Sequence, residues 1–144
     1  MNKLEEIIET FQDLDNESRL QLLIDFAEKL PPIPEAYCTL VQKQAHRVHE
    51  CQTSVSLWVN VVNGKVQIYA DVPRESPTVR GFIALLIKAF TGASPIEIDK
   101  APTDILNRTG LASSLGMMRL QGLSAVYRRI KDETRRASFL NSRN

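Results

Sequence analysis

Cys51 is the side chain in this sequence whose type and position point most directly to chemistry. It is one of two cysteines among 144 residues, and it lies in the segment 48–53 (VHECQT), where polar residues lead into the first β-like alternation. His46, Arg47 and His49 are close in sequence, and nearby positive charge favours the thiolate, which is the nucleophilic form of cysteine. These features predict a reactive thiol at Cys51.

A structural role in the core is the alternative for Cys51, because free cysteine is among the most buried residue types. The polar residues that follow it, 52–54 (QTS), favour an accessible position instead. Both interpretations stay open on the residues alone. The other cysteine, Cys38, lies in a proline-rich stretch and is predicted to be structural or incidental.

Other chemical motifs are missing from the sequence or match poorly. It contains no P-loop, dinucleotide-binding glycine fingerprint or HExxH motif, and no Gly-x-Ser-x-Gly elbow supports a serine hydrolase. Two cysteines are too few for a four-cysteine metal cluster or a disulfide framework. Two cysteines and two histidines together offer zinc ligands, but their spacing matches no common zinc pattern. These four residues are Cys38, His46, His49 and Cys51.

Length and composition predict one globular domain over residues 1–144. The sequence is 43% hydrophobic and 24% charged, which is ordinary for a soluble protein. The first residues (MNKLEE) lack the apolar stretch of a signal peptide, and no apolar run approaches membrane-spanning length. We therefore expect a cytoplasmic protein without a membrane partner. The net charge of +1 argues against a nucleic-acid partner.

The first fifty residues are predicted to be mainly helical. Apolar residues at helical spacing predict an amphipathic helix within residues 1–14. A second helix is predicted to begin at the capping side chains of residues 15–18 and to end before the prolines at 31–32. Residues 31–50 show little periodicity and predict an ordered loop, with a less regular pattern at 41–48 that allows a short strand.

A β-hairpin is predicted after Cys51. From there apolar and polar residues alternate to position 61, and Asn63-Gly64 favours a type I′ turn because both residues tolerate positive φ. A second strand is predicted over residues 65–70. Together with the segment 41–48, this gives a sheet of about three strands.

Helices are predicted for the second half of the chain. Ser76-Pro77 predicts a helix start, Gly92 predicts its end, and residues 94–97 (SPIE) form a second start signal with a capping box. Short helical pieces follow, and then a last helix from about Met118, with residues 137–144 as a frayed tail. The predicted class is α+β, a small antiparallel sheet packed against helices.

Three stretches of the sequence follow the order and spacing of one known family. Residues 50–58 read ECQTSVSLW, residues 70–82 read ADVPRESPTVRGF, and residues 110–123 read GLASSLGMMRLQGL. They resemble a Gly-Cys-x-Ser-x-Val-Trp strand, an Ala-Asp-Ser-Asp-like turn before an Arg/Lys-Gly-Leu helix, and a Gly-Leu, Leu-Ser/Thr-Pro-x-Arg, Gly-Leu stretch. These are typical of the SufE family of sulfur-acceptor proteins, whose fold is shared with IscU. The resemblance covers roughly residues 15–135 and implies a SufE/IscU-like fold.

This sequence departs from the family pattern at three places. Glu50 stands where the family has a glycine before the cysteine. Glu75 aligns with the second aspartate of the acidic turn, and residues 116–118 (GMM) replace the Ser/Thr-Pro pair. The cysteine itself is retained as Cys51.

The resemblance implies sulfur transfer on Cys51. SufE-like proteins accept sulfane sulfur from a pyridoxal-phosphate-dependent cysteine desulfurase of the SufS type and pass it toward iron–sulfur cluster assembly on a SufBCD-like scaffold. On this expectation the Cys51 thiolate attacks the terminal sulfur of the desulfurase's persulfide, which is thiol–disulfide exchange chemistry. The cofactor belongs to the desulfurase, so we expect this chain to hold no cofactor and no metal of its own.

Four further residues are implied as supporting candidates. Arg119 aligns with a family arginine and is expected to stabilise the Cys51 thiolate or persulfide, with a structural cap onto backbone carbonyls as the alternative. Asp71 and Glu75 are candidates for ordering the cysteine loop, and His49 for favouring the thiolate. Residues of these three types are more often solvated surface residues than participants in chemistry.

Two other function classes stay open. One is an IscU/NifU-like metal or cluster scaffold, which would assemble its site from several cysteines with Asp or His. The other is a non-catalytic regulator that binds a desulfurase through its surface and needs no thiol.

Overall fold

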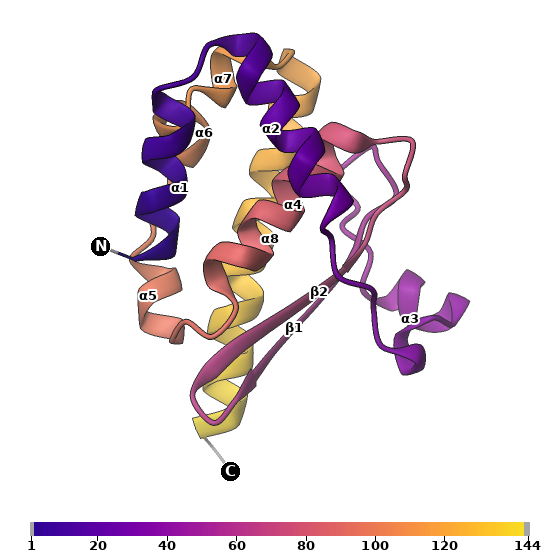
Figure 1. Ribbon diagram of the computed structural model, residues 1–144. Coiled ribbons are helices and arrows are strands. Elements are labelled where there is room, and N and C mark those ends of the chain that lie inside the picture. The colour runs from indigo at the N-terminus through magenta and orange to yellow at the C-terminus, as the bar shows by residue number, and fades with distance from the viewer. Residues whose placement is uncertain (1, 143–144) are drawn as a thin grey trace.

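Helices make up most of the computed structural model, which describes residues 2–142 (Figure 1). In this part of the chain α4 and α8 lie at the centre, with α1 and α2 on one side and the β-hairpin alongside the second half of α8. The elements are α1 (Lys3–Gln12), α2 (Asn16–Glu28), the 3-10 helix η1 (Glu35–Tyr37), α3 (Leu40–Ala45), β1 (Ser56–Val62), β2 (Lys65–Asp71), α4 (Pro77–Phe90), α5 (Pro95–Asp99), α6 (Ile105–Arg108), α7 (Leu111–Ser114) and α8 (Met117–Ser142).

The sheet is one antiparallel hairpin. β1 pairs with β2 from Ser56 opposite Asp71 to Val62 opposite Lys65, which leaves only Asn63 and Gly64 in the turn. These two residues have φ angles of 54° and 75°, as the predicted type I′ turn requires. The inner residues of the hairpin pack against α8. The predicted α+β class, with a small antiparallel sheet on helices, is therefore confirmed.

The number of strands differs from the prediction of about three. Two strands pair within the described residues, and the segment 41–48 contributes only an isolated bridge from Arg47 to Ser56. Most of that segment is α3, because the side chain of Thr39 accepts a hydrogen bond from the Gln42 N–H and caps a helical turn. The predicted loop over residues 31–50 thus contains two short helices.

Local capping explains where several helices begin. The Asp15 carboxylate accepts a hydrogen bond from the Ser18 N–H at 2.8 Å, and this bond lowers the pKa of Asp15. Ser94 and Glu97 form the predicted capping box at the start of α5. Pro77 occupies the first turn of α4, but the side chain of Ser76 caps nothing there.

The core is centred on α4, which is buried on almost all sides. Its Gly81 lies against α2, where a Cβ would overlap the backbone carbonyl of Leu23. Arg80, the preceding residue, donates hydrogen bonds to the carbonyl oxygens of Ala27 at 3.1 Å and Val72 at 2.6 Å. The largest fully buried side chains are Phe11, Phe82, Ile8, Leu23, Ile83, Leu85, Leu86, Ile98, Ile105, Leu111, Leu123 and Ile130.

The last helix continues further than the sequence pattern predicts. α8 extends to Ser142, so residues 137–142 of the expected frayed tail are helical, and residues 143–144 lie outside the described chain. Ion pairs of Glu133 with Arg129 at 3.1 Å and Arg136 at 3.6 Å span one turn of this helix and support it. Among the described residues, every helix is too short or too polar to cross a bilayer.

We predict that Gly81→Ala destabilises the protein by about 2 kcal/mol net. The added methyl group would overlap a backbone carbonyl oxygen, so its cost should lie at the upper end of the range of about 1–3 kcal/mol for overpacked contacts. The better helix propensity of alanine, worth about 1 kcal/mol, offsets only part of this cost. Urea unfolding followed by circular dichroism measures the difference. Gly116→Ala is the control, since a Cβ there meets open space, and its stability should change by less than about 0.5 kcal/mol. Equal stability of the two variants would contradict the close packing of α2 on α4.

Candidate functional site

Cys51 lies in a closed loop that precedes β1. The Val48 N–H donates to the Val55 carbonyl oxygen at 2.9 Å, and this bond joins the two ends of the loop. The Cys51 N–H donates to the Val48 carbonyl oxygen at 3.3 Å, which folds the chain into a turn. The strand itself begins only at Ser56, so the alternation that starts at Cys51 in the sequence belongs partly to this loop. Its valines are buried and hold the loop onto the core.

The Cys51 thiol is sheltered against α8. Its residue is 4% exposed, and a Cβ built on Gly122 would lie 3.3 Å from Sγ and 3.9 Å from Cα of Cys51. Glycine inside a helix costs about 1 kcal/mol relative to alanine, so its position here needs a reason. The missing side chain leaves the room in which the sulfur lies.

A cavity of about 260 Å³ opens beside the thiol. Figure 1 shows how it arises: the connection that leads into β1 and the connection from β2 to α4 come together at one end of the hairpin. The start of α8 forms the remaining wall. The lining residues are Cys51, Gln52, Thr53, Glu75, Ser76, Pro77, Thr78, Val79, Met118, Arg119 and Gly122. The three family-like stretches of the sequence therefore meet around one sulfur atom.

Two of the predicted supporting residues line this cavity with Cys51. Arg119 and Glu75 are both exposed, and neither forms an ion pair with another described residue. An arginine without a carboxylate partner keeps its donors available for an anion at the cavity. The structure thus places Arg119 and Cys51 on the same cavity.

The other two predicted residues lie elsewhere. Asp71 is at the end of β2 and pairs with Lys43 at 3.4 Å, so its carboxylate holds α3 against the hairpin. His49 is exposed in the loop and does not line the cavity. Its neighbour His46 is tilted over the Trp58 ring, with the two ring centroids 5.3 Å apart.

Gly122 and the start of α4 are parts of the site to which sequence reasoning assigned no role. Residues 76–79 line the cavity because the helix begins beside the cysteine loop. Their only signal was the Ser76-Pro77 helix start. Gly122 had a clearer one, since a glycine within an apolar helical pattern often marks a close approach by another part of the chain.

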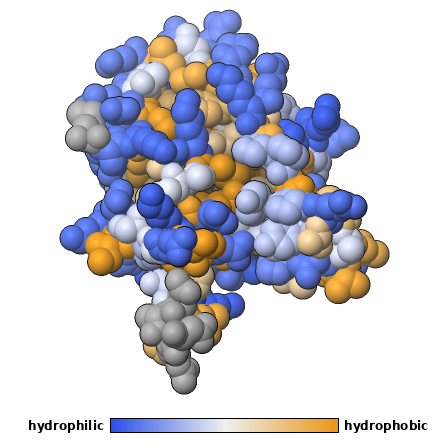
Figure 2. Space-filling model, turned by 60° about the horizontal axis from the view of Figure 1, so that its bottom comes forward, coloured by the Kyte–Doolittle hydropathy of each residue, from blue (hydrophilic) through white to orange (hydrophobic). Residues whose placement is uncertain are grey.

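Cys38 is in a different environment from Cys51. It is exposed at the end of η1, and its Sγ lies 3.6 Å from the Pro34 carbonyl oxygen. The adjoining α3 exposes Leu40 and Val41, at 70% and 75%. Figure 2 shows hydrophobic residues at the surface on the side of the molecule where α3 lies.

Metal-binding side chains do not gather in the described part of the chain. Among residues 2–142, no group of three or more His, Cys, Asp and Glu side chains is placed to hold a metal ion. The four zinc candidates of the sequence lie apart from one another. Cys38 is at the exposed end of η1, and His46 lies over the Trp58 ring. His49 is on the loop surface, and Cys51 lines the cavity.

Comparisons with known proteins show the family to which this chain belongs. Residues 5–134 match the SufE family, described as the Fe-S metabolism associated domain, and the chain belongs to this family. An uncharacterised SufE-like protein of Mycobacterium tuberculosis is 32% identical over 135 residues, which are 93% of this chain and 92% of that protein. The sulfur acceptor protein CsdE of Escherichia coli is 30% identical over 112 residues, 76% of this chain and 72% of CsdE.

A solved structure extends the likeness to three dimensions. The solution structure of a hypothetical protein from Thermus thermophilus is similar with a TM-score of 0.82 at 36% sequence identity. The match covers 96% of this chain and 99% of the other. Most of this fold is therefore of a kind already seen in an experimental structure.

We predict that Cys51 reacts with a soluble disulfide reagent about tenfold or more slowly than Cys38, because its sulfur is buried. Each thiol is measured alone, in Cys38→Ala and Cys51→Ala. Gly122→Ala, combined with Cys38→Ala, should speed the reaction of Cys51 several-fold, since a Cβ 3.3 Å from Sγ pushes the sulfur and its loop away from α8. In denaturant all variants should react alike. A Cys51 rate equal to that of Cys38 in the folded protein would contradict the sheltered thiol.

Proposed function

We propose that this protein is the sulfur acceptor of a pyridoxal-phosphate-dependent cysteine desulfurase and that Cys51 carries the sulfur. The observation that supports this most strongly is the cavity, in which one thiol meets Arg119 and Glu75 from the other two family-like stretches. Membership of the SufE family and similarity to a protein named as a sulfur acceptor support the same class of reaction.

The chemical step is an exchange at sulfur. The Cys51 thiol gives up its proton, and its thiolate attacks the terminal sulfur of a cysteine persulfide on the desulfurase. A new sulfur–sulfur bond forms at Cys51, the donor's sulfur–sulfur bond breaks, and the donor cysteine leaves as a thiolate. No electrons enter or leave the pair of proteins, so the step needs neither an oxidant nor a reductant.

The sheltered position of Cys51 has two consequences for sulfur transfer: it protects the persulfide, and it requires the loop to open. A persulfide held against α8 is protected from soluble thiols, because its sulfur is covered by the loop and by Gly122. The same cover keeps a donor cysteine away, so the loop has to open when the desulfurase binds. The bond between Val48 and Val55 is the contact that such an opening breaks.

Arg119 is proposed to stabilise the anionic sulfur. It lines the cavity and has no ion-pair partner in the described chain, so its guanidinium can turn toward Cys51. Glu75 is proposed to order the loop from the opposite wall. The loop-ordering role of Asp71 and the thiolate-favouring role of His49 stay predictions. Asp71 forms an ion pair with Lys43, and His49 is exposed.

The onward step is proposed to deliver sulfur to iron–sulfur cluster assembly on a SufBCD-like scaffold, in the cytoplasm. A persulfide can pass its terminal sulfur to another thiol by the same exchange, so one cysteine serves both the uptake and the release of sulfur.

We predict that Cys51→Ala abolishes sulfur uptake while the fold is retained, since among the described residues no other thiol lines the cavity. The protein is incubated with a cysteine desulfurase and cysteine, and peptides are analysed by mass spectrometry under non-reducing conditions. The peptide that contains Cys51 should gain the mass of one sulfur atom. Cys38→Ala is the matched control and should load normally.

Two outcomes would contradict the proposal. Sulfur that appears on Cys38 alone would mean that the wrong thiol was chosen. Stimulation of the desulfurase that survives in Cys51→Ala, without sulfur on this chain, would favour a regulator that acts through its surface.

We predict that Arg119→Gln slows sulfur loading about tenfold, the value of one hydrogen bond to a charged group. Arg119→Lys should recover part of the rate, because it restores the charge without the planar fork. Rapid-quench loading assays at saturating desulfurase measure the step itself. Arg128→Gln is the control, since Arg128 is also exposed on α8 and does not line this cavity. Equal loading by Arg119→Gln and Arg128→Gln would assign Arg119 a structural role only.

A further inference from the structure

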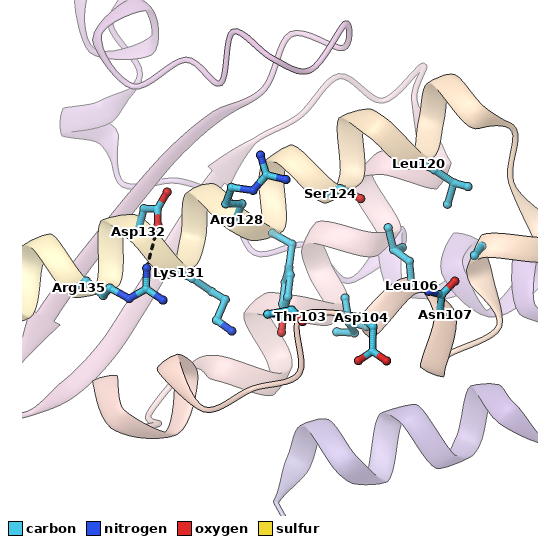
Figure 3. Close-up of a pocket in the computed structure, with 13 residues that line it drawn as sticks. Thr103, Asp104, Leu106, Asn107, Leu120, Ser124, Arg128, Lys131, Asp132 and Arg135 are labelled. Carbon is cyan, nitrogen blue, oxygen red and sulfur yellow. Dashed lines mark hydrogen bonds and ion pairs between the residues drawn. The ribbon is translucent and has the colours of Figure 1, made fainter.

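A second, larger cavity lies against α8 and shares no lining residue with the cavity of Cys51. Its volume is about 380 Å³, and it separates α8 from the segment 103–112 that contains α6 (Figure 3). The residues that α8 contributes follow one helical face: Leu120, Ser124, Tyr127, Arg128, Lys131, Asp132 and Arg135. Residues 118, 119 and 122 of the same helix face the Cys51 cavity instead.

One end of this cavity is apolar. Leu106 and Leu120 approach it from opposite walls in Figure 3, and Ile105 and Ala112 are further apolar residues of the cavity lining. Tyr127, which is also buried, donates its hydroxyl hydrogen bond to the Pro102 carbonyl oxygen at 2.6 Å. With its hydroxyl occupied, the tyrosine offers its ring to the cavity. Such a surface accepts a flat hydrocarbon body.

The other end carries a buried ammonium group. Lys131 is only 6% exposed, and its Nζ donates to the Ala101 carbonyl oxygen at 2.6 Å. The same nitrogen lies 5.5 Å from the centroid of the Tyr127 ring. No carboxylate of the described residues lies within ion-pair distance of it, and its burial lowers the pKa of Lys131. A buried ammonium with one carbonyl partner has donors left for an anion.

The neighbouring arginine Arg135 is already paired, so the Lys131 ammonium is the cation in the cavity that is available to bind an anion. Arg135 is already held by Asp99 at 2.5 Å and by Asp132 at 3.1 Å, as the dashed line in Figure 3 marks for Asp132. Arg128, one turn before Lys131, is exposed and has no ion pair with any described residue. Figure 3 shows its guanidinium turned away from Thr103 and Asp104, so the side chain has to swing toward the cavity to reach an anion bound at Lys131.

We propose that this cavity binds a small free molecule with one carboxylate on a flat apolar body. The carboxylate lies at Lys131, with Arg128 as a second donor, and the body lies between Leu106 and Leu120. Asp104 is the carboxylate on the opposite wall, and it disfavours a second negative charge at that end. The site therefore selects monocarboxylates over dianions, amides and amines.

A purely structural role for Lys131 predicts a different result. Its bond to Ala101 and the bond of Tyr127 to Pro102 both tie α8 to the segment after α5. If this tie were the whole role of Lys131, replacement would lower the stability of the protein without affecting any ligand. Binding that depends on ligand charge separates the two roles.

The test uses indole-3-acetate as the probe, with indole-3-acetamide and tryptamine as neutral and cationic analogues of the same shape. Amide chemical shifts of the full-length protein are followed by NMR up to about 10 mM of each compound, which detects weak binding. The acid should give saturable shifts at residues 103–107 and 124–131. The amide and the amine should bind about tenfold or more weakly, because they lack the charge-assisted bond.

Variants assign the binding to the two cations. Lys131→Met keeps most of the apolar volume and should weaken binding of the acid about tenfold, and Arg128→Gln should weaken it several-fold. Arg136→Gln is the matched control, because Arg136 lies on α8 outside this cavity and its loss should change nothing. If Lys131→Met fails to fold, the Arg128→Gln variant and the comparison of acid, amide and amine still test whether the cavity binds a carboxylate.

Equal binding of acid and amide, binding that ignores both cations, or the absence of saturable shifts would each overturn the proposal. Sulfur loading on Cys51 should be unchanged in Arg128→Gln, since the two cavities share no residue. The proposal therefore stands or falls independently of the proposed function.

Discussion

The close approach of the Cys51 sulfur to α8 is the constraint on which the rest of this structure depends. It favours a glycine at position 122, because a Cβ there would lie 3.3 Å from Sγ and would push the sulfur or its loop away from the helix. It also requires a loop that closes on itself, which the bond between Val48 and Val55 provides. A thiol on an open strand would need neither feature. The glycine destabilises the helix by about 1 kcal/mol relative to alanine, and it leaves the space in which the sulfur is buried.

The remaining elements hold the two sides of this contact in place. α4 is fixed to α2 by the packing at Gly81 and by the hydrogen bonds of Arg80, and its first turn forms one wall of the cysteine cavity. The hairpin, with its two-residue turn, holds the far end of the loop against α8. α8 itself borders both cavities, with Arg119 and Gly122 on one face and Lys131 on another. One long helix thus borders two cavities with different linings.

The sequence allowed the local features of the fold to be predicted, because each depends on neighbouring residues. The Asn63-Gly64 turn and the capping box at Ser94 are examples, and the family was visible in three short stretches. Features that depend on tertiary packing were less accessible. The alternation from Cys51 onward did not reveal that the strand begins at Ser56, and nothing local showed that Asp71 is taken by Lys43. The helical turn capped by Thr39 replaced a third strand, since capping acts locally whereas strand pairing needs a partner.

The most direct test of the account is hydrogen exchange of the Val48 amide, which makes the bond that closes the cysteine loop. Exchange is measured by NMR on labelled protein, alone and with a saturating cysteine desulfurase. The account predicts slow exchange in the free protein, because Val48 is buried and bonded, and about tenfold or faster exchange in the complex as the loop opens. Equal protection of this amide in both states, while sulfur still reaches Cys51, would contradict it.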